Sequence, residues 1–276
     1  MGYQIEYAYT CHTGKVRANN EDNFWCCGES LEAENFGTDH VLVGCEHQSQ
    51  IPLLAVFDGM GGESCGEMAA YLAADACGGY YREHKEEIFT VPGKFWNEIC
   101  KFMNKEVCDY ARENRISSMG ATAAMLGFGK KSAYICNLGD SRVYRWCDEE
   151  FMQMSTDHVL AGGLFGKAPL VQFVGIPEEQ MLLEPSIIET DFLPGDRYLI
   201  CSDGLTDMVN PVEIKEILEK KESVKDTVEM LLGKALEAGG KDNITIVLCE
   251  VKELEQRTNL ISWFKQILKI RNENEN

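Results

Sequence analysis

Acidic residues stand at the ends of apolar runs at five places in this chain, usually beside glycine or asparagine. They are Asp22 before Phe24-Trp25, Asp58 after the run 53–57, Asp140 after 133–138, Asp203 after 198–201 and Asp242 before 244–248. Carboxylates at buried strand ends are costly unless their charge is compensated, and several at one edge repel each other. Divalent cations provide that compensation, and ligands made only of oxygen favour Mg²⁺ or Mn²⁺ over zinc or copper.

A site of this kind has a defined chemistry. Two cations about 3.5–4 Å apart can share a bridging water and activate it as a nucleophile. Glycine beside a carboxylate lets the backbone approach an ion or a phosphate closely. Each Asp-Gly pair taken alone is equally consistent with a simple turn. The five strand ends taken together favour a Mg²⁺ or Mn²⁺ site.

The segments that carry these acids are short and rich in β-branched and aromatic residues, which predicts strands. The predicted strands are 5–9, 22–27, 41–44, 53–57, 121–127, 133–137, 143–146, 187–192, 197–201 and 243–251. Helices are predicted over 63–89 and 92–116, and two more begin after Asn210 and Ser223. Strands and helices do not alternate strictly, so the order excludes a doubly wound sheet and favours antiparallel sheets flanked by helices.

The composition narrows the class of protein. The chain has 276 residues, and 26 Lys and Arg against 45 Asp and Glu give a formal net charge of −19. That balance argues against nucleic-acid binding, which needs a basic face. The sequence contains no apolar run of about 18 residues that would predict a transmembrane segment, and no secretory signal. We therefore expect a cytoplasmic protein, whose 12 cysteines are free small hydrophobic residues in a reducing compartment.

Seven short motifs follow one another along residues 5–251. They are Arg17 with Asn20-Glu21-Asp22, Asp58-Gly59-Met60-Gly61-Gly62, Gly120-Ala121-Thr122, Gly139-Asp140-Ser141-Arg142, Asp157-His158, Ser202-Asp203-Gly204-Leu205-Thr206-Asp207 and Asp242-Asn243-Ile244-Thr245. Each is weak alone, but the ordered set is specific. It resembles the metal-dependent Ser/Thr protein phosphatases of type 2C, in their compact bacterial form.

The resemblance implies an α+β fold, a four-layer α-β-β-α sandwich in which helix pairs flank two antiparallel β-sheets. The catalytic domain would span 1–252. The resemblance also implies a centre of two Mn²⁺ or Mg²⁺ ions, with Asp58 bridging both. Asp203 and Asp242 would serve one ion, with Asp22 nearby, partly through water.

The remaining site residues come from the same resemblance. Glu21 and the Gly59 carbonyl would serve the other ion. Asp140 and Asp207, with Asp203, match the positions that hold a third, weaker ion. Arg17 matches the guanidinium that grips the substrate phosphate, a role suited to its planar fork.

The implied activity is hydrolysis of phosphoserine and phosphothreonine on proteins by a metal-bridged water, with Arg17 and Asp58 as catalytic residues. The partners would be phosphorylated proteins of the kind a Ser/Thr kinase produces. No cysteine nucleophile is needed, and Cys77 precedes Arg82 by one residue too few for a tyrosine-phosphatase loop. A second hypothesis is a catalytically weak phosphoprotein-binding sensor of the same fold. A sensor would normally have lost a metal carboxylate, whereas all the expected ones are present.

Two features depart from the family pattern or lie outside it. Met60 stands where many relatives carry a histidine that could protonate the leaving group, although compact bacterial relatives also carry methionine. The stretch 157–189 is short, and its substrate-flanking flap is reduced or altered, so the resemblance leaves substrate choice open.

The C-terminal segment 253–276 is treated as a helical appendage. Projected as a helix, its apolar residues fill about half of the circumference, and 257–271 contains basic residues but no acids. The pattern predicts an amphipathic helix that docks on the catalytic domain, on a partner or on an anionic membrane surface.

Overall fold

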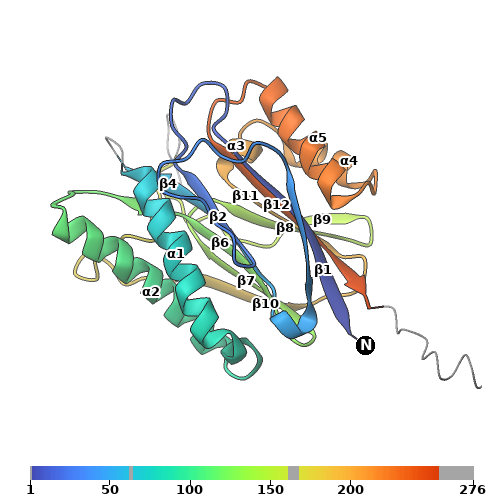
Figure 1. Ribbon diagram of the computed structural model, residues 1–276, viewed down its shortest axis with the longest axis horizontal. Helices are drawn as coiled ribbons and strands as arrows, with labels where there is room; N and C mark the ends of the chain where they lie inside the picture. The colour runs from blue at the N-terminus through green and yellow to red at the C-terminus, as the bar shows by residue number, and fades with distance from the viewer. Residues whose placement is uncertain (1, 62–64, 161–167, 255–276) are drawn as a thin grey trace, which may run out of the picture.

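The computed structural model describes residues 2–61, 65–160 and 168–254. Its strands form two antiparallel sheets (Figure 1). In the first sheet the strands are β3 (Leu42–His47), β1 (Tyr3–His12), β12 (Ile244–Glu253), β11 (Arg197–Cys201), β8 (Arg142–Cys147) and β9 (Glu150–Gln153), in that order. In the second they are β10 (Ser186–Asp191), β7 (Ser132–Leu138), β6 (Ala123–Phe128), β4 (Leu53–Met60) and β2 (Asp22–Cys26), and the short β5 (Gly120–Ala121) pairs with β4.

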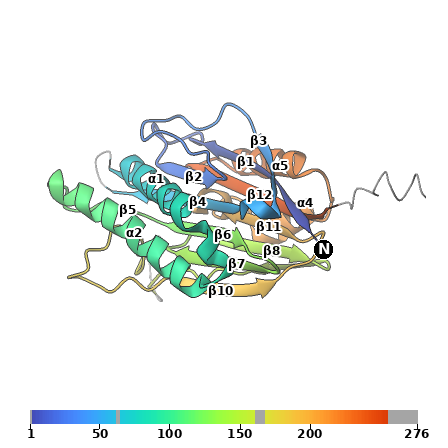
Figure 2. The same cartoon turned by 60° about the horizontal axis from the view of Figure 1, so that its bottom comes forward.

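Helices cover the outer face of each sheet (Figures 1 and 2). The long helices α1 (Gly66–His84) and α2 (Pro92–Glu113) pack on the second sheet. The shorter α3 (Asp203–Thr206), α4 (Pro211–Leu218) and α5 (Val224–Glu237) pack on the first. Two single-turn helices, η1 (Gln48–Gln50) and η2 (Lys85–Phe89), complete the described elements. The predicted four-layer α-β-β-α sandwich is therefore confirmed.

The strands alternate their side chains between two apolar layers. In β11, Tyr198 and Ile200 enter the core between the sheets, whereas Leu199 and Cys201 pack under the helices. This two-residue period is the reason that the inner strands are buried on both faces. All 12 cysteines are free thiols, and most of them lie in these apolar layers.

Local capping signals predicted the helix starts well. Asn210 caps α4 through its side chain, and Glu213 completes the capping box. Ser223 caps α5, and Gly239 and Gly240 adopt positive φ angles just beyond its end. The first two helices are shorter than expected: α1 ends at His84, where η2 begins, and α2 ends at Glu113 instead of 116.

The β8–β9 hairpin was missed. Its two turn residues, Asp148 and Glu149, both adopt positive φ angles of 49° and 66°. Such turns normally carry Asn-Gly or Asp-Gly, and the pair Asp-Glu gives no such signal. The one-turn helix α3 was also missed, because four residues are too few to show a helical period.

One register brings the chemistry to a single edge. β1 pairs with β12 over ten residues, from Tyr3 opposite Glu253 to His12 opposite Ile244. The segment after His12 therefore lies beside the segment before Ile244. No helix in the described part of the chain is long and apolar enough to cross a membrane. The C-terminal appendage lies outside the described residues from 255 onward.

Candidate metal centre

Two of the predicted ligands face each other across neighbouring strands. Asp22 at the start of β2 is the direct antiparallel partner of Asp58 near the end of β4. Like charges directly opposite each other destabilise a sheet. A cation bound near them would reverse that effect, so metal binding at this pair would also stabilise the fold.

Glu21 is fixed next to this pair by backbone contacts. Its carbonyl accepts a hydrogen bond from the Gly59 amide at 2.9 Å, and its own amide donates to Asn243 Oδ1 at 2.8 Å. A Cβ on Gly59 would stand 2.0 Å from the Gly66 carbonyl oxygen, and a Cβ on Gly66 would stand 2.7 Å from Glu21 Oε2. Only glycine fits at position 59, and the close approach at Gly66 shows that the start of α1 lies directly against the Glu21 carboxylate.

Negative charge is concentrated here. Burial raises the pKa of Glu21, and the charges of Glu67 and Asp242 raise it further, against an opposing hydrogen bond from Asn19. A bound cation would favour the ionised carboxylate, which is the form that binds metal.

Arg17 lies among the predicted ligands. Its Nη2 donates to Asp242 Oδ2 at 2.7 Å, and its side chain is 48% exposed. That hydrogen bond is the main cause of the raised pKa of Arg17, and the charges of Asp242, Glu21 and Asp58 contribute. The loop that carries Arg17 packs closely on the segment of Asp242. Gly14 in this loop adopts φ +83°, and a Cβ there would stand 2.2 Å from the Asp242 carbonyl oxygen. Arg17 therefore has an open side toward solvent and a carboxylate behind it.

Asp22 is held from behind by two hydroxyl groups. Ser202 Oγ and Thr245 Oγ1 each donate to Asp22 Oδ2 at 2.7 Å, and all three residues are buried. These donors favour the charged carboxylate and fix its rotamer. One oxygen of Asp22 is thus occupied by hydrogen bonds inside the protein. This arrangement suits a carboxylate that acts on a metal through water.

The predicted third-ion residues lie at the ends of adjacent strands. Asp203 opens α3, which packs so closely on the start of β12 that a Cβ on Gly204 would stand 1.8 Å from the Asn243 carbonyl oxygen. Asp207 follows one helical turn later, and its amide donates to the Asp203 carbonyl at 2.8 Å. Asp140 is buried, and it follows Gly139, which adopts φ +98°.

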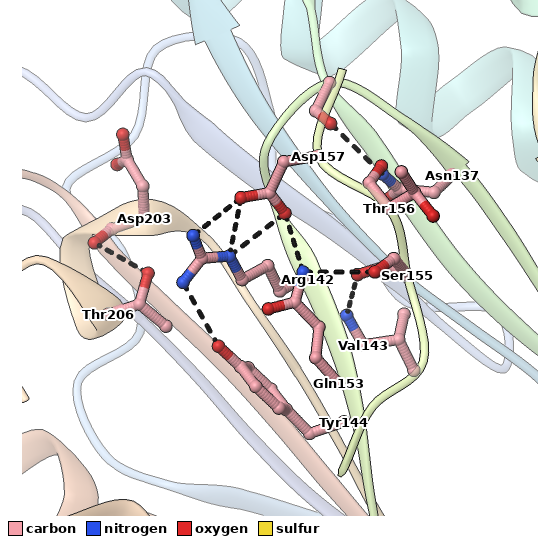
Figure 3. A network of polar contacts seen from close by, with 11 residues as sticks. Asn137, Arg142, Val143, Tyr144, Gln153, Ser155, Thr156, Asp157, Asp203 and Thr206 are labelled. Carbon is pink, nitrogen blue, oxygen red and sulfur yellow. Dashed lines mark hydrogen bonds and ion pairs between the residues drawn. The ribbon is translucent and has the colours of Figure 1, made fainter. Parts of the chain in front are cut away.

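A polar network supports this edge (Figure 3). Arg142 binds both carboxylate oxygens of Asp157, at 2.6–3.1 Å, and also donates to the Tyr144 hydroxyl. Arg142 lies opposite Cys201 in the sheet, and Cys201 precedes Asp203 by two residues. The network therefore connects Asp157 to the end of β11, which Asp203 follows.

Several supporting residues were not identified from the sequence. Thr122 Oγ1 accepts a hydrogen bond from the Asp58 amide at 3.0 Å and lies 2.7 Å from Ser141 Oγ. Ser202 and Thr245 hold Asp22 as described above. All four lie in the quoted motifs, and Ser141 and Ser202 stand directly beside the predicted ligands Asp140 and Asp203, so the motifs were the available signal. His158 has a structural contact, since its amide donates to the Gly139 carbonyl at 2.9 Å.

The Cys11 thiol near the site is not a nucleophile. Cys11 is buried, Asn20 Nδ2 donates to its Sγ at 3.0 Å, and Thr245 Oγ1 lies 3.1 Å from the same sulfur. Burial is the main cause that raises the pKa of Cys11 to about 12. A thiol with that pKa stays protonated at neutral pH and is unreactive.

The donor set fits a hard cation. The side chains that reach this edge are carboxylates with oxygen ligands, backed by hydroxyl and amide groups, with neither imidazole nor thiolate among the predicted ligands. Among the described residues, no three His, Cys, Asp or Glu side chains already form a cluster that could hold a metal ion. Asp242 instead engages Arg17. Metal binding at Asp242 would therefore compete with this ion pair.

The chain is similar to known phosphatases along most of its length. The family model "Protein phosphatase 2C" matches residues 32–245. The "Serine/threonine phosphatase stp" of Listeria innocua is 30% identical over 254 residues, which cover 86% of this chain and 92% of that protein.

Solved structures show the same relationship. The crystal structure of the Mycobacterium tuberculosis serine/threonine phosphatase PstP/Ppp superimposes with a TM-score of 0.72 at 25% identity, covering 91% of this chain and 100% of that one. The catalytic domain of PstP in complex with 2 manganese ions matches with a TM-score of 0.70 at 25% identity, covering 91% and 100%.

Proposed function

Because the chain belongs to the protein phosphatase 2C family, we propose that it hydrolyses phosphoserine and phosphothreonine on proteins with the help of Mn²⁺ or Mg²⁺. The observation that supports the proposal is that Asp22 faces Asp58 across β2 and β4, and that the charges of Asp58, Glu21 and Asp242 all act on Arg17. That edge combines ligands for hard cations with a guanidinium group open to solvent.

The residues at this edge would divide the work. Asp58, Asp203 and Asp242, together with Glu21 and the Gly59 carbonyl, would hold two cations, and Asp140 and Asp207 would serve a third. When bound, such cations lower the pKa of a water molecule, which can then attack phosphorus in line. Arg17 would take two phosphate oxygens in its planar fork and balance their charge. Asp22, held by Ser202 and Thr245, would orient the water shell of the cations.

The product alkoxide needs a proton. Met60 ends β4 and pairs with Gly120, and its thioether cannot donate one. The proton would therefore come from solvent at the open edge. No covalent phosphoenzyme is required, because the water reacts directly with phosphorus.

We expect Met60→His to separate two classes of substrate. An alkyl leaving group such as threonine needs a proton, whereas p-nitrophenolate leaves without one. The variant should therefore hydrolyse a phosphothreonine peptide several-fold faster and leave the rate on p-nitrophenyl phosphate unchanged. Equal changes on both substrates, measured as kcat, would contradict this assignment.

Substrates and location follow from the same proposal. The substrates are phosphorylated proteins, and we place the protein in the cytoplasm, where its 12 free thiols would stay reduced. The segment 253–276 is proposed to be a separate appendage whose basic amphipathic face docks on the acidic domain.

If the appendage docks on the domain, truncation after Glu253 should lower the melting temperature and increase aggregation, because the apolar surface that docking would cover becomes exposed. The measurement is thermal unfolding of both proteins, with light scattering. An unchanged melting temperature together with loss of binding to anionic liposomes would instead place the appendage on a membrane and contradict docking on the domain.

The proposed function is tested with the purified chain, a phosphothreonine peptide and Mn²⁺. Turnover that stops on addition of EDTA and returns with Mn²⁺ supports hydrolysis. Tight binding of the phosphopeptide without turnover would overturn the proposal in favour of a sensor.

A further inference from the structure

An exposed aromatic ring stands beside the loop that carries Arg17. Phe36, between β2 and β3, is 85% exposed, more than any other large apolar residue in the described ranges. Val16, directly before Arg17, is 68% exposed. Single exposed apolar residues are common, so the exposure of this ring is informative only if the surrounding backbone is ordered.

The backbone around Phe36 is clamped to the end of β1. Thr13 Oγ1 donates to the Phe36 carbonyl at 3.0 Å, and the Thr38 amide donates to the Cys11 carbonyl at 2.7 Å. Gly37 between them adopts φ +88°, and a Cβ there would stand 2.2 Å from the Cys11 carbonyl oxygen. Only glycine fits this close approach. The exposure of the ring is therefore imposed by an ordered turn.

The same turn is bonded to the predicted metal edge. Asn20, which is buried and precedes Glu21, donates through Nδ2 to Asn35 Oδ1 at 2.7 Å. Asn35 Oδ1 also accepts from the Gly37 amide at 2.9 Å. One side of the turn is thus attached to the loop of Arg17 and the other to the residue before Glu21. The turn that carries the ring therefore lies next to the loop that carries Arg17.

The surroundings of the ring are acidic. Glu29, Glu32, Glu34 and Asp39 are all exposed in the same connecting segment. No ion pair joins any of the four to another residue in the portion of the chain that the structure describes. An uncompensated acidic surface favours a partner that carries Lys or Arg.

We propose that Phe36 and these four acids, named here the Phe36 surface, dock the polypeptide that flanks the phosphorylated residue. The inference rests on the proposed function and adds a substrate class to it. The preferred substrate segment carries an apolar side chain that packs on the Phe36 ring and basic side chains that face the acids. Arg17 then takes the phosphate while the Phe36 surface takes the chain beside it.

The test compares two phosphothreonine peptides that differ only in their flanks. One carries Leu and Arg, and the other carries Gly and Ser at those positions. The unchanged protein should favour the Leu/Arg peptide about tenfold in kcat/KM, a difference typical of an aromatic interface contact with complementary charge. Phe36→Ala should remove most of this preference through KM and leave the rate on p-nitrophenyl phosphate unchanged.

Matched variants isolate the ring and the charges. Leu193→Ala is the control for the ring, because Leu193 is 63% exposed and lies near Gly195, which bonds to Val251 at the far end of β12. It should change none of the three rates. The double variant Glu32→Gln and Glu34→Gln should weaken the preference for Arg, and high salt should do the same in the unchanged protein.

Three outcomes would overturn the inference while leaving the proposed function in place. One is a Phe36→Ala protein with the same peptide preference as the unchanged protein. Another is an equal loss on peptides and on p-nitrophenyl phosphate, since the ring would then support the site's structure. A third is a dimer that Phe36→Ala converts to monomer without altering peptide preference, which assigns the ring to a second copy. If the unchanged protein with Mn²⁺ hydrolyses none of the three substrates, the proposed function fails and the docking inference fails with it.

Discussion

We expect Asp58→Asn to lower kcat/KM on a phosphothreonine peptide by more than about 10³-fold, a larger loss than removal of a single hydrogen-bond donor from an active site. The substitution keeps the shape of the side chain and removes the charge that would bridge both cations. Asp203→Asn should lose activity on the same scale, because it removes a ligand charge from one of the two ions.

The fold should survive these changes. Asp58 is only partly buried, and it faces Asp22 across the strand pair. In the absence of metal, replacing one of the two charges relieves repulsion, so the melting temperature of Asp58→Asn should be equal to or above that of the unchanged protein. In the presence of Mn²⁺ the order should reverse, because only the unchanged protein gains stability from the bound ions.

A matched control separates site chemistry from general loss of charge. Asp191 is exposed and lies opposite Ser132, at the end of the second sheet away from Asp140. Asp191→Asn should retain full activity and the full stabilisation by Mn²⁺. Activity of Asp58→Asn at the level of this control, or activity that survives EDTA, would contradict the metal mechanism.

The second large effect concerns Arg17. Arg17→Ala should lower kcat/KM by about 10²-fold, which corresponds to loss of a charge-assisted, two-point contact with phosphate. Arg17→Lys should recover only part of this loss, because a single ammonium group cannot present the planar fork. The measurement is steady-state kinetics on the peptide at saturating Mn²⁺.

The structure adds a condition that distinguishes substrate binding from metal binding. Arg17 is bonded to Asp242, which is a predicted ligand. Removing the guanidinium frees that carboxylate, so the affinity for Mn²⁺ should stay the same or increase while kcat/KM falls. Arg82→Ala is the control, since Arg82 lies in the last turn of α1, far along the helix from Gly66, which packs against Glu21. Unchanged kinetics for Arg17→Ala, or a fall in activity that higher Mn²⁺ restores, would show that Arg17 does not bind the phosphate.

Features that depend on neighbouring residues could be predicted from the sequence, whereas the pairing and register of the strands could not. Asn210 and Ser223 were predicted as caps because a cap depends on residues within one turn. The acidic strand ends were predicted because each stands next to its own apolar run. The opposition of Asp22 and Asp58 depends on which strands pair and in what register, and neither can be read from one segment.

The contacts between distant segments were likewise invisible. Nothing near Arg17 in the sequence points to Asp242, 225 positions away. The hydroxyls that hold Asp22 come from Ser202 and Thr245, which reach it only because β2 and β12 begin where β11 ends. The apolar side chain of Phe36 would by itself predict a place in the core. The close approach of Gly37 to the Cys11 carbonyl, which the structure reveals, explains why Phe36 faces solvent.

Calorimetric titration of the metal-free protein with Mn²⁺, in parallel with its Asp58→Asn variant, tests the central assignment most directly. We expect two tightly bound ions per unchanged chain and loss of tight binding in the variant, because Asp58 would be the ligand shared by both. Two tight sites that persist in Asp58→Asn, or no Mn²⁺ binding by the unchanged protein, would contradict the placement of a binuclear metal centre at this sheet edge.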